Sequence, residues 1–140
     1  MKDRREEALV ARLSAYDSLV EVGVGRRPDV AAGLAAAGCA VTATDVHEFP
    51  VPDSVEFVQD DVVAASEAAA PGEHYQADAL YALNSPPDLH GPLRDVARAV
   101  GADCLFTTLG FDEPAVPVRR ESLDAETLYV AESDVRGGLS

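Results

Sequence analysis

The sequence is poor in basic residues: Lys2 is its single lysine, and 11 Lys and Arg stand against 25 Asp and Glu. The net charge of −14 disfavours nucleic acid, without excluding it as a partner, because binding to a polyanion depends on clustered Lys and Arg. A high negative charge also keeps proteins soluble at high salt, where the Debye length falls to about 3 Å at 1 M. This excess of acidic over basic residues, together with abundant Ala and Val, is typical of proteins from salt-accumulating microbes. We therefore expect an acidic, halophilic protein.

Long apolar runs are missing as well, and none approaches the roughly 20 residues that a membrane-spanning helix needs. The charged segment 1–7 is not followed by the apolar stretch of a secretory signal. We therefore expect a cytoplasmic protein without membrane contact. Cys39 and Cys104 have no CxxC spacing and the three histidines are scattered, so we expect no metal site.

What is present is enough apolar sequence for one core. The chain has 140 residues, of which 47% are hydrophobic, and this length predicts a single domain without a separate substrate domain. We expect residues 1–140 to form that domain, with its core at about 5–132 and a frayed tail at 133–140.

Short apolar segments alternate with segments of helical periodicity. This alternation predicts βαβ units and hence a Rossmann-like, doubly wound α/β fold, in which helices flank a mainly parallel sheet of five to six strands. We expect strands at 18–23, 40–45, 55–58, 79–83 and 104–109, helices at 6–16, 28–37, 62–70 and 92–100, and a terminal hairpin from 116–120 and 127–131.

The loop after the first expected strand carries the strongest functional signal. In doubly wound sheets the ligand lies outside the carboxyl ends of the strands, where the strand order reverses. Gly23 and Gly25 follow the first strand and allow bare backbone to approach a ligand. Asp45 comes 20 residues after Gly25, the separation at which an acidic side chain meets the ribose hydroxyls of an adenosine. The spacing predicts an adenosine-containing small-molecule cofactor.

The residues around the glycines bear on which cofactor is bound. A dinucleotide site usually has a third glycine, but Pro28 stands at that position, after Arg26 and Arg27. The acidic Glu21 suits a ligand with a positive end, such as the sulfonium and amino group of S-adenosylmethionine. We therefore favour S-adenosylmethionine, and the alternative is a non-catalytic sensor or scaffold module that binds NAD(P) or another adenosine nucleotide.

Segment 21–25, Glu-Val-Gly-Val-Gly, resembles the first motif of class I, Rossmann-like S-adenosylmethionine-dependent methyltransferases. That motif reads acidic-x-Gly-x-Gly and continues to a further glycine, in whose place this chain has Arg27. The resemblance implies that Glu21, Gly23 and Gly25 hold the cofactor, that Asp45 binds its ribose, and that Asp60 lies near its adenine amino group.

A second segment, 84–88 or Asn-Ser-Pro-Pro-Asp, is similar to the (Asp/Asn/Ser)-Pro-Pro-aromatic motif that follows the fourth strand in the same superfamily. The resemblance implies that Asn84, Ser85 and Pro86 are the catalytic residues that orient a methyl acceptor. Asp88 occupies the aromatic position, so this segment offers no ring on which a nucleobase could stack.

Over about residues 5–132 the chain resembles a small archaeal family of uncharacterised Rossmann-like proteins. This resemblance implies the fold and a cytoplasmic location, and it brings no assigned reaction. Methyltransferases of the superfamily commonly add two strands after the fifth, and little chain follows Leu109. We therefore expect a homodimer or a protein partner to complete the site.

Overall fold

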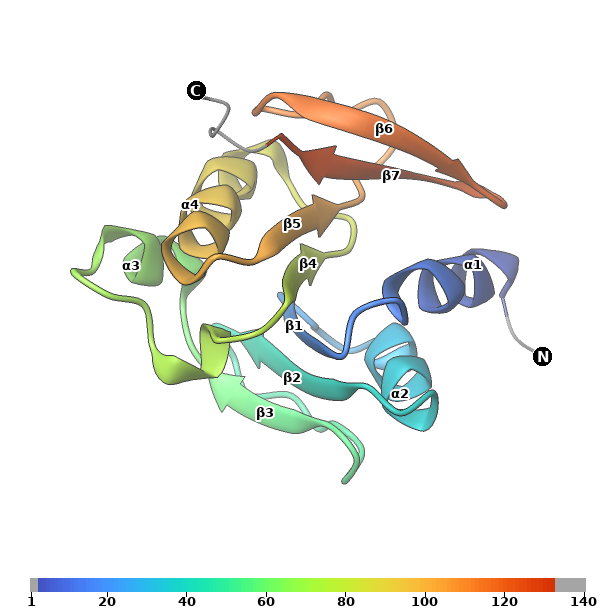
Figure 1. Cartoon of the computed structure of the whole chain (residues 1–140), viewed down its shortest axis with the longest axis horizontal. Coiled ribbons are helices and arrows are strands. Elements are labelled where there is room, and N and C mark those ends of the chain that lie inside the picture. Colours follow the sequence, from blue (N-terminus) through green and yellow to red (C-terminus); the bar gives the residue numbers. More distant parts are fainter. Residues whose placement is uncertain (1–2, 133–140) are drawn as a thin grey trace.

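A seven-stranded sheet forms the centre of the computed structural model, which describes residues 3–132 (Figure 1). The strand order is β3-β2-β1-β4-β5-β7-β6; β1 to β5 are parallel, whereas β7 runs antiparallel to β5 and β6. The strands are β1 (Ser18–Val22), β2 (Ala40–Asp45), β3 (Glu56–Gln59), β4 (Ala79–Ala82), β5 (Asp103–Phe106), β6 (Val118–Leu123) and β7 (Glu126–Ala131). The order reverses between β1 and β4, so their carboxyl ends mark the expected ligand position.

Helices cover both faces of the sheet and give three layers (Figure 1). They are α1 (Arg4–Leu13), α2 (Asp29–Ala36), α3 (Val62–Glu67) and α4 (His90–Val100), with 3₁₀ turns η1 (Glu73–Tyr75) and η2 (Pro87–Leu89). Two apolar clusters fill the interfaces, one under α1 and α2 and the other under α3 and α4. Within residues 3–132 no helix is both long enough and apolar enough to cross a bilayer.

The predicted Rossmann-like, doubly wound α/β fold is confirmed, but the sheet has seven strands where five to six were expected. Both halves of the expected hairpin join the sheet, because β7 pairs with β5 and β6 pairs with β7. The expectation that little of the superfamily's further structure fits after Leu109 was wrong for the two added strands, which the expected hairpin supplies. An antiparallel pair needs only a tight turn, here Asp124-Ala125 with Ala125 at φ 64°, whereas each parallel strand needs a long crossover. Completion of the site by a homodimer or partner stays a prediction.

Several element boundaries differ from the sequence expectations. Helix α4 begins at His90 and not at residue 92, because the 3₁₀ turn η2 leads directly into it. Strand β5 ends at Phe106 rather than at 109, and the chain then leaves the sheet as a loop in which Gly110 has φ 56°. The expected frayed tail at 133–140 lies outside the described residues.

Candidate functional site

The glycine turn after β1 is built as the sequence predicts. Gly23 and Val24 donate backbone hydrogen bonds of 2.8 and 3.0 Å to the Thr44 carbonyl oxygen at the end of β2. Gly23 and Gly25 have φ of 78° and 59°, a region that side chains with a Cβ adopt at a cost. A Cβ on either glycine would meet no atom within 4 Å. The turn is therefore an open cradle of bare backbone at the carboxyl end of β1.

Asp45 is bonded to this turn. One of its carboxylate oxygens accepts a 2.9 Å hydrogen bond from the Gly25 backbone N–H, and the other accepts a 3.2 Å bond from His47 N–H. The structure thus brings Asp45 and Gly25 together across the 20 residues that separate them. Val46, which follows Asp45, keeps 51% of its surface exposed and offers an apolar face at this edge that the sequence analysis did not identify.

Glu21 is a buried carboxyl group beneath the turn. Only 2% of its surface is exposed, and its Oε1 accepts a 2.8 Å hydrogen bond from the Tyr81 hydroxyl. Burial raises the pKa of Glu21 to about 8, and Asp29 adds to the rise while the bond from Tyr81 opposes it. A positive charge placed beside Glu21 would lower this pKa again, so the site favours a cationic ligand group.

Glu21 borders a cavity of about 230 Å³ at the ligand edge of the sheet. Helix α1, the glycine turn, the start of α2, the loop after β4, Thr107 and the start of β7 enclose it. A smaller cavity of about 90 Å³ lies on the other side, against α3 and α4. Gly23, Leu83 and Asn84 line both cavities, so they stand between them.

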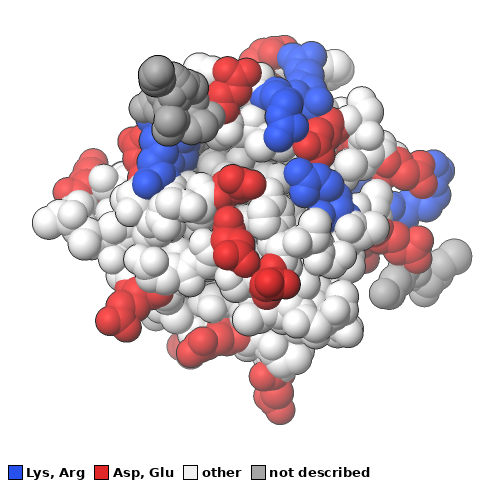
Figure 2. Space-filling view, in the orientation of Figure 1, with Lys and Arg blue, Asp and Glu red and all other residues white. Residues whose placement is uncertain are grey.

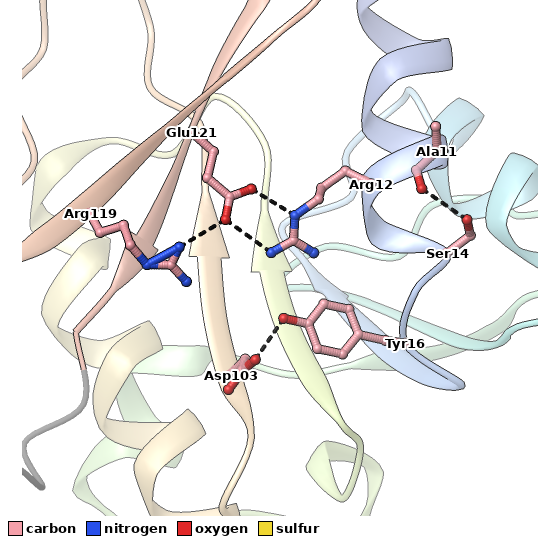
Figure 3. Close-up of polar contacts among 7 residues, drawn as sticks. All are labelled: Ala11, Arg12, Ser14, Tyr16, Asp103, Arg119 and Glu121. Atoms are coloured by element: carbon pink, nitrogen blue, oxygen red, sulfur yellow. Dashed lines mark hydrogen bonds and ion pairs between the residues drawn. The ribbon is translucent and has the colours of Figure 1, made fainter.

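Helix α1 lines the larger cavity, and ion pairs hold it against the terminal hairpin. Arg12 makes a two-pronged contact with Glu121, at 2.7 and 3.2 Å, and Arg119 donates to the same carboxylate (Figure 3). Arg4 and Arg5 pair with Asp124 and Glu126 of the hairpin. The chain's own β6 and β7 therefore position α1 beside the cavity.

Asp60 lies at the carboxyl end of β3, where the resemblance to methyltransferases expects it. Its carboxylate contacts the His74 ring at 2.8 Å and accepts a 2.9 Å bond from the Asp61 N–H. Burial acts to raise the pKa of Asp60, but the contacts with His74 and Asp61 outweigh it and hold the pKa below its usual value. The Asp60 carboxylate is thus already bonded, so a ligand group that reached it would share it with His74.

The loop after β4 is held by hydrogen bonds to Thr107. Asn84 has φ 51°, and its backbone N–H donates a 2.8 Å bond to the Thr107 hydroxyl. Ser85 is buried; its N–H donates to the Thr107 carbonyl and its hydroxyl donates to the Pro86 carbonyl. Within residues 3–132 the side-chain amide of Asn84 has no hydrogen-bond partner, so it is the polar group of this loop that is available to a ligand.

His90 fixes this loop, a role that the sequence analysis missed. Its ring is fully buried and stacks on Phe106 with centroids 4.0 Å apart. Nδ1 accepts a 3.0 Å bond from the Ala115 N–H, so Nε2 carries the proton and donates to the Ser85 carbonyl at 3.1 Å. No sequence spacing could reveal this contact, because a loop more than twenty residues away supplies the partner.

Charge is unevenly distributed around the site. No Lys or Arg occurs between Arg27 and Arg94. In the view of Figure 2 the basic side chains lie in the upper half, where Figure 1 places β6 and β7, and the charged side chains visible in the lower half are all acidic.

Arg26 and Arg27 are exposed at the glycine turn, and neither forms an ion pair with a carboxylate of residues 3–132. Arg26 instead lies over the Phe49 ring, 5.9 Å from its centroid. No three His, Cys, Asp or Glu of the described part of the chain form a metal-binding group.

Residues 5–133 match the model of an uncharacterised protein family, UPF0146. The UPF0146 protein of the archaeon Halobacterium salinarum is 49% identical over 124 residues, which cover 88% of this chain and 93% of that protein. The chain belongs to the UPF0146 family, which confirms the predicted resemblance to a small, uncharacterised archaeal family.

Solved structures of methyltransferases share the fold. An RNA methyltransferase from Salinibacter ruber, crystallised with S-adenosyl-L-homocysteine, matches with a TM-score of 0.63 and 16% identity over 100% of this chain and 98% of its own. A 1,6-didemethyltoxoflavin-N1-methyltransferase from Burkholderia thailandensis, also with S-adenosylhomocysteine, matches with a TM-score of 0.50 and 26% identity over 90% of this chain. The chain spans 58% of the length of that second enzyme. The fold is thus that of class I methyltransferases.

Proposed function

We propose that this UPF0146 protein binds S-adenosylmethionine at the carboxyl ends of β1 and β2 and is a methyltransferase-like domain whose acceptor is still to be identified. The observation that carries the proposal is Glu21, a buried carboxyl group that borders a cavity beside an open glycine cradle. A sulfonium and an ammonium group are the complements of such a carboxylate.

The residues present fit each part of the ligand. Gly23 and Gly25 leave space above the turn for close approach of the ligand. Asp45 is preorganised by its bonds to Gly25 and His47, and a carboxylate can accept hydrogen bonds from both ribose hydroxyls. We assign Asp60, which directly follows β3, to the adenine amino group. Two structural neighbours were crystallised with S-adenosylhomocysteine, which supports the same ligand class here.

When bound, S-adenosylmethionine supplies an activated methyl group, and transfer requires mainly that the acceptor be aligned with it. We assign this alignment to the loop after β4. Asn84 offers its free amide to the acceptor, while Ser85 and Pro86 hold the loop through their internal hydrogen bonds.

Isothermal titration in molar KCl with S-adenosylmethionine, S-adenosylhomocysteine, NAD and NADP tests the proposal. We expect both S-adenosyl ligands to bind and to release protons near pH 7, because their ammonium group lowers the raised pKa of Glu21. Titration in buffers of different ionisation enthalpy measures this release. Micromolar binding of NAD or NADP without a response to either S-adenosyl ligand would establish the alternative, a nucleotide-binding sensor, in which Arg26 and Arg27 meet the phosphates.

A matched variant separates the charge of Glu21 from its shape. Glu21→Gln keeps the size of the side chain and its contact with Tyr81, but it has no proton to release. We expect S-adenosylmethionine to bind this variant more weakly and without proton release. Equal affinity and equal proton release in both proteins would show that Glu21 does not face the cationic end of the ligand.

A further inference from the structure

The larger cavity at the ligand edge of the sheet is lined by more acidic than basic side chains. Five carboxyl groups and three guanidinium groups border it, which gives the lining a net charge of −2 when all of them are ionised. The carboxyl groups belong to Asp3, Glu6, Glu21, Asp29 and Glu126, and the guanidinium groups belong to Arg5, Arg26 and Arg27. Charges interact more strongly across a cavity than on an open surface, because less water screens them. The lining therefore favours a ligand end with two positive charges.

Glu21 keeps one carboxyl oxygen for this ligand end. Its Oε1 accepts from the Tyr81 hydroxyl, whereas Oε2 has no hydrogen-bond partner within residues 3–132. In the same range the Tyr75 hydroxyl is the single fully enclosed polar side-chain atom without a partner, so Oε2 is not enclosed but opens to the cavity that Glu21 lines. An unbonded oxygen on a carboxyl group that is almost entirely buried is costly. A cationic group in the cavity would satisfy it.

Two of the three guanidinium groups at the cavity are already engaged. Arg5 forms a 3.1 Å ion pair with Glu126, whose side chain is only 15% exposed. A ligand carboxylate that recruited Arg5 would leave this carboxylate without its cation, which is unfavourable at a position with little access to water. Arg26 lies over the Phe49 ring, in the loop that follows β2. Neither group is therefore free to meet a carboxylate of the ligand.

The third guanidinium group, that of Arg27, lies among acidic side chains. Burial and the neighbouring Asp29 raise the pKa of Glu6 above its usual value, whereas Arg27 opposes the rise, so the charge of Arg27 already acts on Glu6. Asp29 stands in the first turn of α2, where it complements the positive end of the helix dipole. A ligand carboxylate near Arg27 or the start of α2 would thus meet Glu6 and Asp29 as well.

The amino end of S-adenosylmethionine matches this lining only in part. Its ammonium and carboxylate groups are bonded to the same carbon atom, so an ammonium group that reaches Glu21 brings a carboxylate among the acidic side chains. Without the carboxylate, the sulfonium and ammonium groups present two positive charges, which balance the net charge of the lining. Asp45 and Asp60, which are assigned to the adenosine, do not line the cavity, so the cavity receives the other end of the ligand.

We propose that the site prefers decarboxylated S-adenosylmethionine, which ends in a primary ammonium group, over S-adenosylmethionine itself. This inference rests on the proposed function, since it names the cofactor of the same site. The acidic lining acts as the selective element, because it attracts the two cationic groups that both compounds share and repels the carboxylate that only one of them carries.

Isothermal titration of the wild type with both compounds in molar KCl tests the preference. We expect the decarboxylated compound to bind at least fivefold more tightly, because salt screens partly enclosed charges less than exposed ones. Equal affinity, or tighter binding of S-adenosylmethionine, would overturn the proposal. S-adenosylhomocysteine and its decarboxylated form repeat the comparison without a sulfonium group, and the same preference is expected. Its absence from this second pair would show that the lining does not reject the carboxylate.

Charge variants test whether the lining causes the preference. Glu6→Gln and Asp29→Asn each remove one negative charge from the cavity, and we expect each to narrow the ratio of the two affinities at least twofold. Arg27→Gln removes a positive charge and should widen the ratio. Glu7→Gln is the matched control, because Glu7 is the next residue of α1 and does not line this cavity. The same ratio in all four variants would contradict the proposal.

Two further outcomes identify the occupant and separate this inference from the proposed function. 1,4-Diaminobutane carries two ammonium groups without an adenosine, and we expect it to bind at least tenfold more weakly than decarboxylated S-adenosylmethionine. Equal binding would show that the cavity holds a plain diamine. Failure of every S-adenosyl compound to bind would remove the proposed function, whereas S-adenosylmethionine that binds at least as tightly as its decarboxylated form would remove only the present inference.

Discussion

The Tyr81 hydroxyl donates a 2.8 Å hydrogen bond to the buried carboxyl group of Glu21, and this pair joins neighbouring strands β1 and β4 at the point where the strand order reverses. A carboxyl group in this position is costly to ionise, because burial removes it from water and one hydrogen bond compensates only in part. The cost is expected to fall when a cation binds in the adjoining cavity. We therefore expect Glu21 to couple the stability of the fold and its pH dependence to binding of the proposed ligand.

The first prediction concerns stability as a function of pH. The pKa of Glu21 is raised to about 8, so between pH about 4.5 and 8 the folded protein keeps a proton that the unfolded chain has released. The stabilising contribution of this proton is complete below pH about 4.5 and is lost as the pH rises through 8. We expect Glu21→Gln to flatten this decline, as measured by denaturant unfolding at fixed salt. Parallel profiles for the variant and the wild type would show that Glu21 is ionised in the fold.

Tyr81→Phe serves as the control for that prediction. The variant removes the hydrogen bond that opposes the rise, so the pKa of Glu21 should increase further. The decline in stability should then extend to higher pH than in the wild type. A shift toward lower pH would contradict the assigned direction.

Substitution of Asp45 tests the proposed adenosine site. Asp45→Ala removes the carboxylate that would meet the ribose hydroxyls, and we expect S-adenosylmethionine affinity measured by calorimetry to fall by about 1.5–3 kcal/mol. Asp53→Ala, an exposed change in the loop between β2 and β3, is the control and should leave affinity unchanged. If Asp45→Ala binds as tightly as the wild type, Asp45 serves only to hold the glycine turn.

Gly25 tests whether the glycine turn requires glycine for its conformation. A Cβ at Gly25 would meet no atom, so the cost of Gly25→Ala comes from its φ of 59° and should be roughly 1–2 kcal/mol in unfolding free energy. Gly25→Asn should cost less, because Asn tolerates the left-handed region. Gly91→Ala in α4 has the same free space without a positive φ, and it should stabilise the protein by about 0.5 kcal/mol.

Substitutions of Thr107 test whether its hydroxyl holds the Asn84 loop. Thr107→Val keeps the shape of the side chain but removes the hydroxyl that accepts from Asn84, so we expect a loss of about 1–3 kcal/mol in unfolding free energy. Thr107→Ser keeps the hydroxyl and should cost clearly less. Hydrogen exchange at the Asn84 amide should rise in the Val variant and stay slow in the Ser variant. The same exchange in both would show that the hydroxyl does not hold the loop.

The last prediction concerns the ion pair between Arg12 and Glu121, which holds α1 against the hairpin. Both side chains are about three-quarters buried and share two bonds, so a double-mutant cycle should give a coupling of about 0.5–1 kcal/mol that weakens with salt. The exposed pair Arg4 and Asp124 is the matched control and should show no measurable coupling. Equal coupling for the two pairs would argue against a role for burial.

The sequence predicted those parts of the site that depend on local backbone chemistry. Gly23 and Gly25 could be placed in a turn because only glycine takes such φ values cheaply, and the turn is there. The distance along the chain from Gly25 to Asp45 reflects one βαβ unit, whose length is nearly fixed, and the two residues are bonded as that spacing suggests. The cofactor and the roles of Asn84, Ser85, Pro86 and Asp60 stay proposals.

Other features depended on contacts between distant segments, which no local pattern encodes. The polarity of Glu21 was visible in the sequence, but its burial and its raised pKa arise from packing against β4. His90 looked like a scattered histidine until the fold placed Ala115 and Ser85 against its two nitrogens. The sequence by itself determined the alternation of strands and helices and the glycine turn, because these follow from periodicity and backbone freedom. Only the tertiary structure decided that β6 and β7 complete the sheet and that Thr107 and His90 hold the Asn84 loop, because pairing and burial join residues far apart in the chain.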